Sequence, residues 1–316
     1  MTFAKKKELF DANNPITESC LVKFSGVEGY DVYNPSIPFE WKGKKYIYGR
    51  VERRDEWARS WVRLFEETAP DEFALVKNSM IYQLEDPYIS KIGDEIVMGG
   101  THVQYQRGEI SNFFGYFYRG TDLEDMYYFT TGPDKMKDIR LVQLREGIGV
   151  FSRPRGEDIE KKHGSGSIVG YAVIDNIMSL SSDVISSAKK IDGMFDSGEW
   201  GGCNQCYLLD SGLIGIIGHK SYTDASRNPK QSVYVNVAFV YDPIKHLLVD
   251  EKIIATRKSY PPGPAKMPYL ADCVFTSGIA MRGDGRADLY SGLGDTQAGR
   301  AVIDYPFESY GRIVAK

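Results

Sequence analysis

The chain has 316 residues and a net charge of −4, which argues against a surface built to bind nucleic acid or an anionic membrane. Its 32 glycines and 21 tyrosines favour a turn-rich β protein over a helical one. No run approaches the length of a membrane span, and MTFAKKKELF at the start lacks the apolar core of a signal peptide. We therefore expect a cytoplasmic protein whose four cysteines are free thiols.

In chain order, residues 1–30 are mixed and polar and predict a strand that opens or closes the fold. Residues 33–67 then predict a hairpin around the turn at 42–44 and a third, alternating strand. Residues 84–101 repeat this plan, with two strands on either side of Gly93-Asp94, a favourable two-residue hairpin turn. One weak, serine-rich helix is predicted around 178–191.

Five segments share the plan of a polar residue, a strand, a turn, a second strand, a gap and a third strand. The opening residues lie at intervals of 52, 52, 66 and 68 residues and are Asn34, Asp86, Asp138, Asn204 and Asp272. Internal periods of this size are typical of propeller blades, and propellers have about four to eight of them. We predict an all-β fold, a five-bladed β-propeller that forms one domain over residues 1–316, with blade cores beginning near 34, 86, 138, 204 and 272.

In a propeller the first strand of each blade lines the central channel, so the five opening residues should face one another around one pocket. Asp86 follows Glu85 and precedes Pro87, which disfavours helical backbone at Asp86 and predicts an extended chain there. An isolated Asp-Pro would only cap a turn. Because the arrangement recurs along the chain, we interpret Asp86 as a site residue at the mouth of a hairpin.

Motifs in the five segments follow the order of a known family. They are Asn34-Pro35 with Arg50 and Glu52; Glu85-Asp86-Pro87; Lys137-Asp138 with Arg153-Pro154; His219; and Val274-Phe275 with Gly278, Asp295 and Thr296. With these residues the chain resembles the five-bladed propeller superfamily of glycoside-active enzymes. Within it, the chain is most similar to the mannoside phosphorylase and mannosidase family, glycoside hydrolase family one hundred and thirty, and to an uncharacterised branch of the same shape. It departs from that family at Tyr88, where the family has arginine, and at Lys220, where it has glycine.

The resemblance implies an enzyme that cleaves a glycosidic bond in a small mannoside-like oligosaccharide, by phosphorolysis or by inverting hydrolysis. Such cleavage needs an acid for the leaving oxygen and a nucleophile on the other face of the sugar. The resemblance makes Asp86 the acid. If water is the nucleophile, the base would be Glu52, Asp138 or Asp272.

If inorganic phosphate is the nucleophile, a basic cradle replaces that base. The candidate anion binders are Arg50, Lys137, Arg153 and His219. An equally good interpretation of Arg50 and Arg153 is an ion pair with Glu52 or with a carboxylate of a neighbouring blade, and Lys137 could be a solvated charge.

Other candidate substrate-binding residues are polar or aromatic side chains near the predicted channel: Asn34, Glu85, His102, Asn204, Tyr222, Asp272 and Asp295. Asp295 could instead be a turn residue, and His102 a buried structural histidine. Candidate sugar-stacking platforms are Tyr33, Trp41, Trp57, Trp61, Tyr222 and Tyr269. Cys203 and Cys206 lack further ligands at zinc-site spacing, so we predict no metal and no cofactor, with inorganic phosphate as a potential co-substrate.

The expected partner is therefore a small oligosaccharide, with no nucleic acid and no membrane, and a homo-oligomer is compatible with the sequence. The alternative class is a non-catalytic propeller that binds sugar or another protein. Substitution of Asp86 separates the two classes, because an enzyme would lose turnover and keep binding, whereas a lectin-like protein would change only in affinity. Fold alone does not decide between them.

Overall fold

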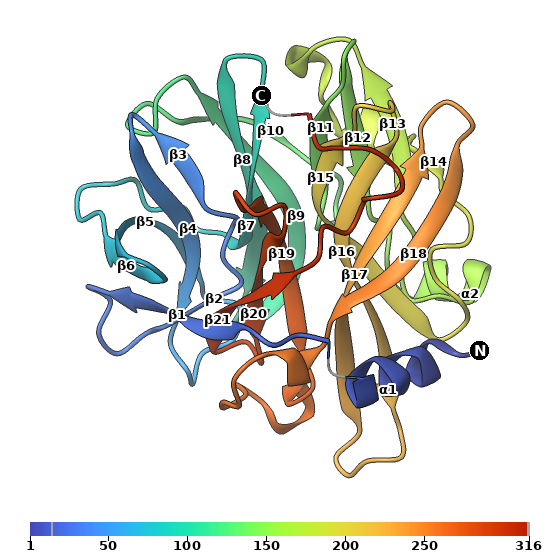
Figure 1. Ribbon diagram of the computed structural model, residues 1–316. Helices are drawn as coiled ribbons and strands as arrows, with labels where there is room; N and C mark the ends of the chain where they lie inside the picture. Colours follow the sequence, from blue (N-terminus) through green and yellow to red (C-terminus); the bar gives the residue numbers. More distant parts are fainter. Residues whose placement is uncertain (14, 315–316) are drawn as a thin grey trace.

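The computed structural model describes residues 1–13 and 15–314, and it is nearly all-β (Figure 1). The largest sheet has nine strands, in the order β19 (Val274–Met281), β20 (Ala287–Leu293), β21 (Gln297–Ile303), β1 (Ser19–Ser25), β6 (Glu72–Leu75), β5 (Trp61–Ala69), β4 (Lys44–Glu52) and β2 (Asp31–Tyr33), with β3 (Phe39–Trp41) paired to β4. All its neighbouring strands pair antiparallel except β1 and β6, which pair in parallel over three residues. The first and last parts of the chain therefore share one sheet.

Three further sheets have four strands each, in chain order or its reverse. The first contains β7 (Glu85–Ile92), β8 (Glu95–Gln106), β9 (Glu109–Gly120) and β10 (Tyr127–Thr131). The second contains β11 (Arg140–Gln143), β12 (Ile148–Ser152), β13 (Gly170–Ile174) and β14 (Lys189–Lys190). The third contains β15 (Glu199–Leu208), β16 (Ile214–Asp224), β17 (Gln231–Asp242) and β18 (Leu247–Ala255). The predicted hairpin turns at 42–44 and at Gly93-Asp94 are confirmed.

The first strands of the sheets meet around a common centre. β7 contacts β4 and β11, β15 contacts β11 and β19, and β2 contacts β20 and β21, so the contacts return to their starting point. The apolar core lies between neighbouring sheets rather than at that centre. One core cluster, for example, joins Val97 and Phe117 of one sheet to Leu141 and Val150 of the next. This leaves the ends of the first strands free to present polar side chains.

Helices are more frequent than predicted. The weak helix expected around 178–191 is present as two short pieces, η1 (Ile177–Ser179) and α3 (Ser182–Ser186). The sequence analysis missed α2 (Glu157–His163) and α1 (Phe3–Asn13). The strand expected within residues 1–30 is confirmed as β1, which follows α1. Two short 3-10 turns, η2 (Arg257–Ser259) and η3 (Pro268–Leu270), precede β19.

Helix α1 lies beside β18 near the N-terminus (Figure 1). It has no clear apolar stripe, and its two buried residues are Phe3, which joins an apolar cluster, and Lys7, whose ammonium lies 2.9 Å from Asp11 of the same helix and 3.3 Å from Asp272. A helix attached through a buried ion pair does not show the hydrophobic periodicity by which helices are found in sequences.

Candidate functional site

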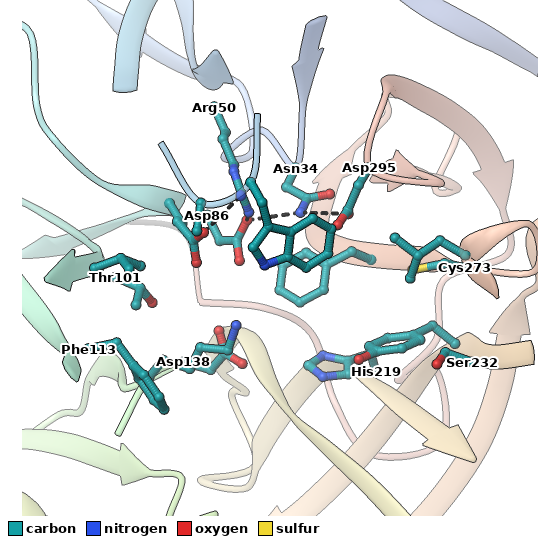
Figure 2. Close-up of a pocket in the computed structure, with 18 of the residues that line it drawn as sticks. Asn34, Arg50, Asp86, Thr101, Phe113, Asp138, His219, Ser232, Cys273 and Asp295 are labelled. Carbon is teal, nitrogen blue, oxygen red and sulfur yellow. Dashed lines mark hydrogen bonds and ion pairs between the residues drawn. The ribbon is translucent and has the colours of Figure 1, made fainter. Parts of the chain in front are cut away.

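A cavity of about 370 Å³ opens where the first strands converge. Nine of the residues proposed from the sequence line it: Asn34, Arg50, Glu85, Asp86, Lys137, Asp138, Arg153, His219 and Asp295. In Figure 2, Asn34, Arg50, Asp86 and Asp295 lie on one side of the cavity, and Asp138 and His219 lie across from them. We call the side with Asp86 and Asp295 the acidic side. We call the side with Asp138 and His219 the basic side, because arginines surround Asp138.

Five cavity residues share an unusual backbone conformation. Asn34, Asp86 and Asp138, which lie 52 residues apart, have φ angles of 43°, 49° and 58°, and Ala58 and Asp295 have φ angles of 55° and 54°. The prediction of extended backbone at Asp86 is therefore wrong, because the residue adopts the left-handed region. Left-handed backbone is costly for residues other than glycine and is concentrated at functional sites. Asn34 directly follows β2, whereas Asp86 and Asp138 lie at the start of β7 and just before β11, and all three side chains line the cavity.

On the acidic side, Asn34 joins two carboxylates. Its Nδ2 donates to Oδ1 of Asp86 at 2.9 Å and to Oδ1 of Asp295 at 3.4 Å. Arg50 Nη1 also donates to Oδ1 of Asp86, at 3.0 Å. The other Asp86 oxygen, Oδ2, makes no hydrogen bond with the described residues and is not among their fully buried unpartnered atoms, so it is open to the cavity. Burial raises the pKa of Asp295, against the opposing effect of Arg50.

Arg50 is surrounded by carboxylates. Its Nη2 lies 2.8 Å from Glu85 and 3.2 Å from Glu52, in addition to the contact with Asp86. The ion-pair interpretation of Arg50 is thus the one that the structure supports, and little of its charge remains for an anionic ligand. Burial raises the pKa of Glu85, with Arg50 acting in the opposite direction.

Glu52 lies behind the cavity wall and not in it, which makes its predicted role as a hydrolytic base wrong. Its carboxylate is fully buried and accepts hydrogen bonds from Lys266 Nζ at 2.6 Å, from Arg50, from the Tyr33 hydroxyl and from the backbone N–H of Arg59 at 2.7 Å. Although burial opposes ionisation, Arg50 and Lys266 lower the pKa of Glu52. All its acceptor capacity is used in holding the structure together.

On the basic side, Asp138 is held by two arginines. Arg153 Nη1 donates to its Oδ2 at 2.7 Å, and Arg140 Nη2 lies 3.7 Å from its Oδ1. Burial favours the neutral acid, but these arginines hold the pKa of Asp138 well below its usual range. A carboxylate of such low basicity is a poor general base.

Lys137 and Arg155 are the cations of the cavity that the described residues leave unpaired. Lys137 lines the cavity and makes no hydrogen bond or ion pair with them, and it is half-buried. Arg155 also lines the cavity, and its guanidinium lies 5.7 Å from the centre of the Phe113 ring. The sequence analysis missed Arg155, although Arg153-Pro154-Arg155 places two arginines on one strand end. Together with Arg153, these residues give the basic side an excess of positive charge.

His219 is buried and neutral. Burial, reinforced by Arg153, lowers its pKa to about 3, so the prediction of a cationic anion binder is wrong for this residue. Its Nδ1 lies 2.8 Å from Oδ1 of Asn204. An amide oxygen only accepts, so Nδ1 carries the proton and Nε2 is an acceptor for a hydroxyl.

Four other candidates lie outside the cavity. Asn204 lies behind His219, Asp272 pairs with Lys7 and Arg227, and the ring of Tyr222 packs edge-on against Phe3. His102 stacks on Tyr116 with ring centres 4.5 Å apart, but it is only partly buried and not the buried histidine of the structural interpretation. The expectation that all five opening residues share one pocket is therefore wrong, because Asn204 and Asp272 do not line it. The longer intervals before these two residues already departed from the 52-residue period.

Among the candidate sugar platforms, Trp57 and Tyr269 line the cavity, whereas Tyr33, Trp41, Trp61 and Tyr222 do not. Further lining residues that the sequence analysis missed are Thr101, Phe113, Ser232, Tyr234 and Phe275. Thr101, Phe113, Ser232 and Tyr234 belong to second and third strands, where no motif distinguished them from core residues, whereas Phe275 lies on β19 and was noted only as part of a family motif. The cavity thus combines buried polar groups with aromatic faces, the composition of a small-molecule site that binds sugars or other polar rings.

Over residues 1–13 and 15–314, no group of three or more histidine, cysteine, aspartate or glutamate side chains has the arrangement of a metal site. Within the same residues, no helix combines the length and apolar character that crossing a membrane requires.

Comparison with solved structures gives matches over nearly the whole chain. A mannose phosphorylase from Leishmania mexicana, solved in complex with a phosphate ion, is 52% identical, with a TM-score of 0.93 and coverage of 99% of this chain and 96% of that one. A GDP-Man-dependent mannosyltransferase from the same organism is 45% identical, with a TM-score of 0.92 and coverage of 100% and 98%. A β-1,2-mannobiose phosphorylase from Listeria innocua shares the fold at 16% identity, with a TM-score of 0.62 and coverage of 89% and 92%.

A search of the curated proteins found no match. Residues 8–309 match the model of one protein family, described as a protein of unknown function (DUF1861). That match spans nearly all of the chain, including every residue of the acidic and basic sides. The chain therefore belongs to the DUF1861 family.

Proposed function

We propose that this chain is a mannoside phosphorylase, which transfers a terminal mannosyl group from an oligosaccharide to inorganic phosphate. The observation that carries the proposal is the pair of cations, Lys137 and Arg155, which line the cavity and make no ion pair with the described residues. Asp138, the residue after Lys137, lies across the cavity from Asp86 (Figure 2). The 52% identical mannose phosphorylase with its phosphate ion supports the same assignment. The likeness to mannose-active enzymes also supports a carbohydrate-active enzyme over the non-catalytic alternative.

The carboxylates favour phosphorolysis over hydrolysis. Inverting hydrolysis needs a base on the face of the sugar opposite the acid. Asp86 and Asp295 contact the same amide nitrogen, so they lie on one side and do not flank a sugar. The carboxylate across the cavity, Asp138, is held by two arginines and is a weak base. Phosphate is itself an anionic nucleophile and needs cations rather than a base.

In the proposed reaction, Asp86 Oδ2 gives its proton to the glycosidic oxygen as the bond from that oxygen to the anomeric carbon breaks. An oxygen of hydrogen phosphate, held by Lys137, Arg153 and Arg155, forms the new bond to that carbon from the opposite face. The products are mannose 1-phosphate and a saccharide shorter by one ring, and the proton that phosphate loses restores the acid. The neutral His219 accepts a hydrogen bond from phosphate or from a sugar hydroxyl at Nε2.

Thermal unfolding with and without inorganic phosphate and mannobiose tests this proposal. A ligand that binds only the native state raises Tm. We expect phosphate alone to raise Tm and to enlarge the shift that mannobiose causes. A shift with mannobiose that phosphate does not change would instead favour hydrolysis, and the absence of any shift would contradict a mannoside site.

A second candidate is mannosyl transfer from a sugar nucleotide, because a GDP-Man-dependent mannosyltransferase is 45% identical over the full chain. The same cations would then hold the diphosphate of the donor. Incubation with GDP-mannose and mannobiose, in the absence of phosphate, distinguishes the two candidates by whether mannotriose forms.

We also infer that the architecture is a five-bladed propeller in one domain. The inference rests on dividing the nine-stranded sheet between β1 and β6, which share only the parallel pairs of Lys23, Phe24 and Ser25 with Glu72, Phe73 and Ala74. Each half then has four main strands, like the other three sheets.

A further inference from the structure

The rim of the cavity differs from its floor. Trp57, Ile110 and Tyr269 line the cavity with 48%, 44% and 36% of their surface exposed, whereas Asn34 and Asp86 are buried. An exposed aromatic side chain is common on protein surfaces and needs no explanation by itself. At this rim, however, the backbone that carries Trp57 is fixed more firmly than an ordinary surface loop.

The segment 53–60, which carries Trp57, is held by two hydrogen bonds and contains one residue in left-handed backbone. Oε1 of the buried Glu52 accepts a hydrogen bond from the backbone N–H of Arg59 at 2.7 Å, which closes the segment. The carbonyl of Trp57 accepts a hydrogen bond from the hydroxyl of Tyr105 on β8. Ala58 has a φ of 55°, a left-handed conformation that alanine adopts only where surrounding contacts impose it.

The second aromatic residue is tied to the same carboxylate. Lys266, whose side chain is 3% exposed, places Nζ 2.6 Å from Oε2 of Glu52 and 3.3 Å from the carbonyl of Arg53. Tyr269 follows three residues later, in η3. One buried carboxylate therefore fixes both segments that carry the exposed aromatic rings, and a platform whose position is set before binding loses little entropy when it takes a ligand.

We propose that Trp57 and Tyr269 form an outer sugar subsite, which binds a ring of the leaving saccharide, and that Glu52 and Lys266 are positioning residues for it. The proposal rests on the proposed function. The ring that is transferred lies deep in the cavity, where Asp86 and the cations reach it, so the rest of the oligosaccharide must extend through the rim. Sugar rings have apolar faces and polar edges, and the outer rings meet aromatic faces instead of buried hydrogen-bonding groups.

Steady-state phosphorolysis of mannobiose and mannotriose by the full chain tests the subsite, with each substrate and phosphate varied separately. We expect Trp57→Ala and Tyr269→Ala each to raise KM for mannotriose about tenfold, as for the loss of a central aromatic contact. Neither substitution should change KM for phosphate. Tyr127→Ala is the matched control, because Tyr127 is 49% exposed and lies on β10, outside the cavity lining.

Lys266→Met tests the positioning role and should raise KM for mannotriose while leaving KM for phosphate unchanged, with Lys266→Arg restoring part of the loss. Because Lys266 is buried, the Tm of each variant is measured to confirm that it is folded. Unchanged KM for both mannosides in both aromatic variants would overturn the outer subsite while leaving phosphorolysis intact. A wild-type chain that acts on no mannoside at all would overturn the proposed function and the subsite together.

Discussion

The two sides of the cavity use the same backbone device for different chemistry. Asp86 and Asp138 lie 52 residues apart, each in left-handed backbone at the start of a sheet. Asp86 has one oxygen engaged by Asn34 and Arg50 and the other open to the cavity. Asp138 is locked between Arg153 and Arg140. The neighbours of each aspartate, and not its position in the repeat, make Asp86 a candidate acid and Asp138 an ion-pair partner of arginines.

This difference teaches that a repeated motif predicts where a polar group is placed but not what it does. The charge around Arg50 is dominated by carboxylates, whereas the cavity residues Lys137 and Arg155 form no ion pair within the part of the chain that the structure describes.

The largest expected effect is on the acidic side. Asp86→Asn should lower kcat for phosphorolysis by about 10²- to 10⁴-fold, the usual contribution of a positioned acid, because the amide cannot give a proton to the leaving oxygen. Binding of mannobiose, measured by its effect on Tm, should persist. A variant with wild-type kcat would show that the two sides do not differ in the way we describe.

A second substitution distinguishes the role of a residue behind the cavity, Glu52, from the role of a residue that lines it, Asp86. Glu52→Gln should lower the free energy of unfolding by about 3–5 kcal/mol, because it leaves Lys266 without its buried anionic partner and removes one of the three carboxylates around Arg50. Denaturant unfolding measures this loss. If Glu52 were a hydrolytic base, kcat of the folded variant would fall as severely as that of Asp86→Asn.

On the basic side, Lys137→Met should weaken phosphate binding. A hydrogen bond to a charged group contributes about 1.5–3 kcal/mol, so KM for phosphate should rise roughly 10- to 150-fold with a smaller effect on mannobiose. Lys162→Met, at an exposed lysine on α2, is the matched control. Equal losses for both substrates would argue against a dedicated anion site.

The smallest expected effect is the pH dependence that His219 contributes. Its folded pKa of about 3 lies below the unfolded value of about 6.5, so below pH 6.5 the unfolded state binds a proton that the folded state does not. The contribution of neutral His219 to the free energy of unfolding is therefore fully present above pH 6.5, and it decreases as the pH falls toward 3. Urea unfolding at pH 7.5 and at pH 5 measures this effect. Between the two pH values, the free energy of unfolding should fall less for His219→Asn than for the wild type. An identical loss in both proteins would mean that His219 is charged in the folded state.

Strands, hairpin turns and the three evenly spaced opening residues could be predicted from the sequence, because alternation and Gly-Asp turns are local signals. Helix α1 could not, since Lys7 is buried by ion pairs with Asp11 and Asp272 rather than by an apolar stripe. The neutral state of His219 and the structural role of Glu52 also depend on burial, which residue type does not reveal.

The rim residues were harder to predict for a different reason. Trp57 was one of several aromatic candidates, and only the contacts of its backbone with Glu52, through Arg59, and with Tyr105 distinguish it from an ordinary surface side chain. Such contacts join segments that are distant in the sequence, and Lys266 adds another from more than two hundred residues away.

The most direct test of the division between the two sides is phosphorus NMR of the purified protein incubated with mannobiose, with and without inorganic phosphate. We expect a new sugar 1-phosphate signal, with inverted anomeric configuration, only when mannobiose and phosphate are both present. Asp86→Asn should abolish this signal. Release of free mannose at the same rate without phosphate, and with no sugar phosphate formed, would contradict it.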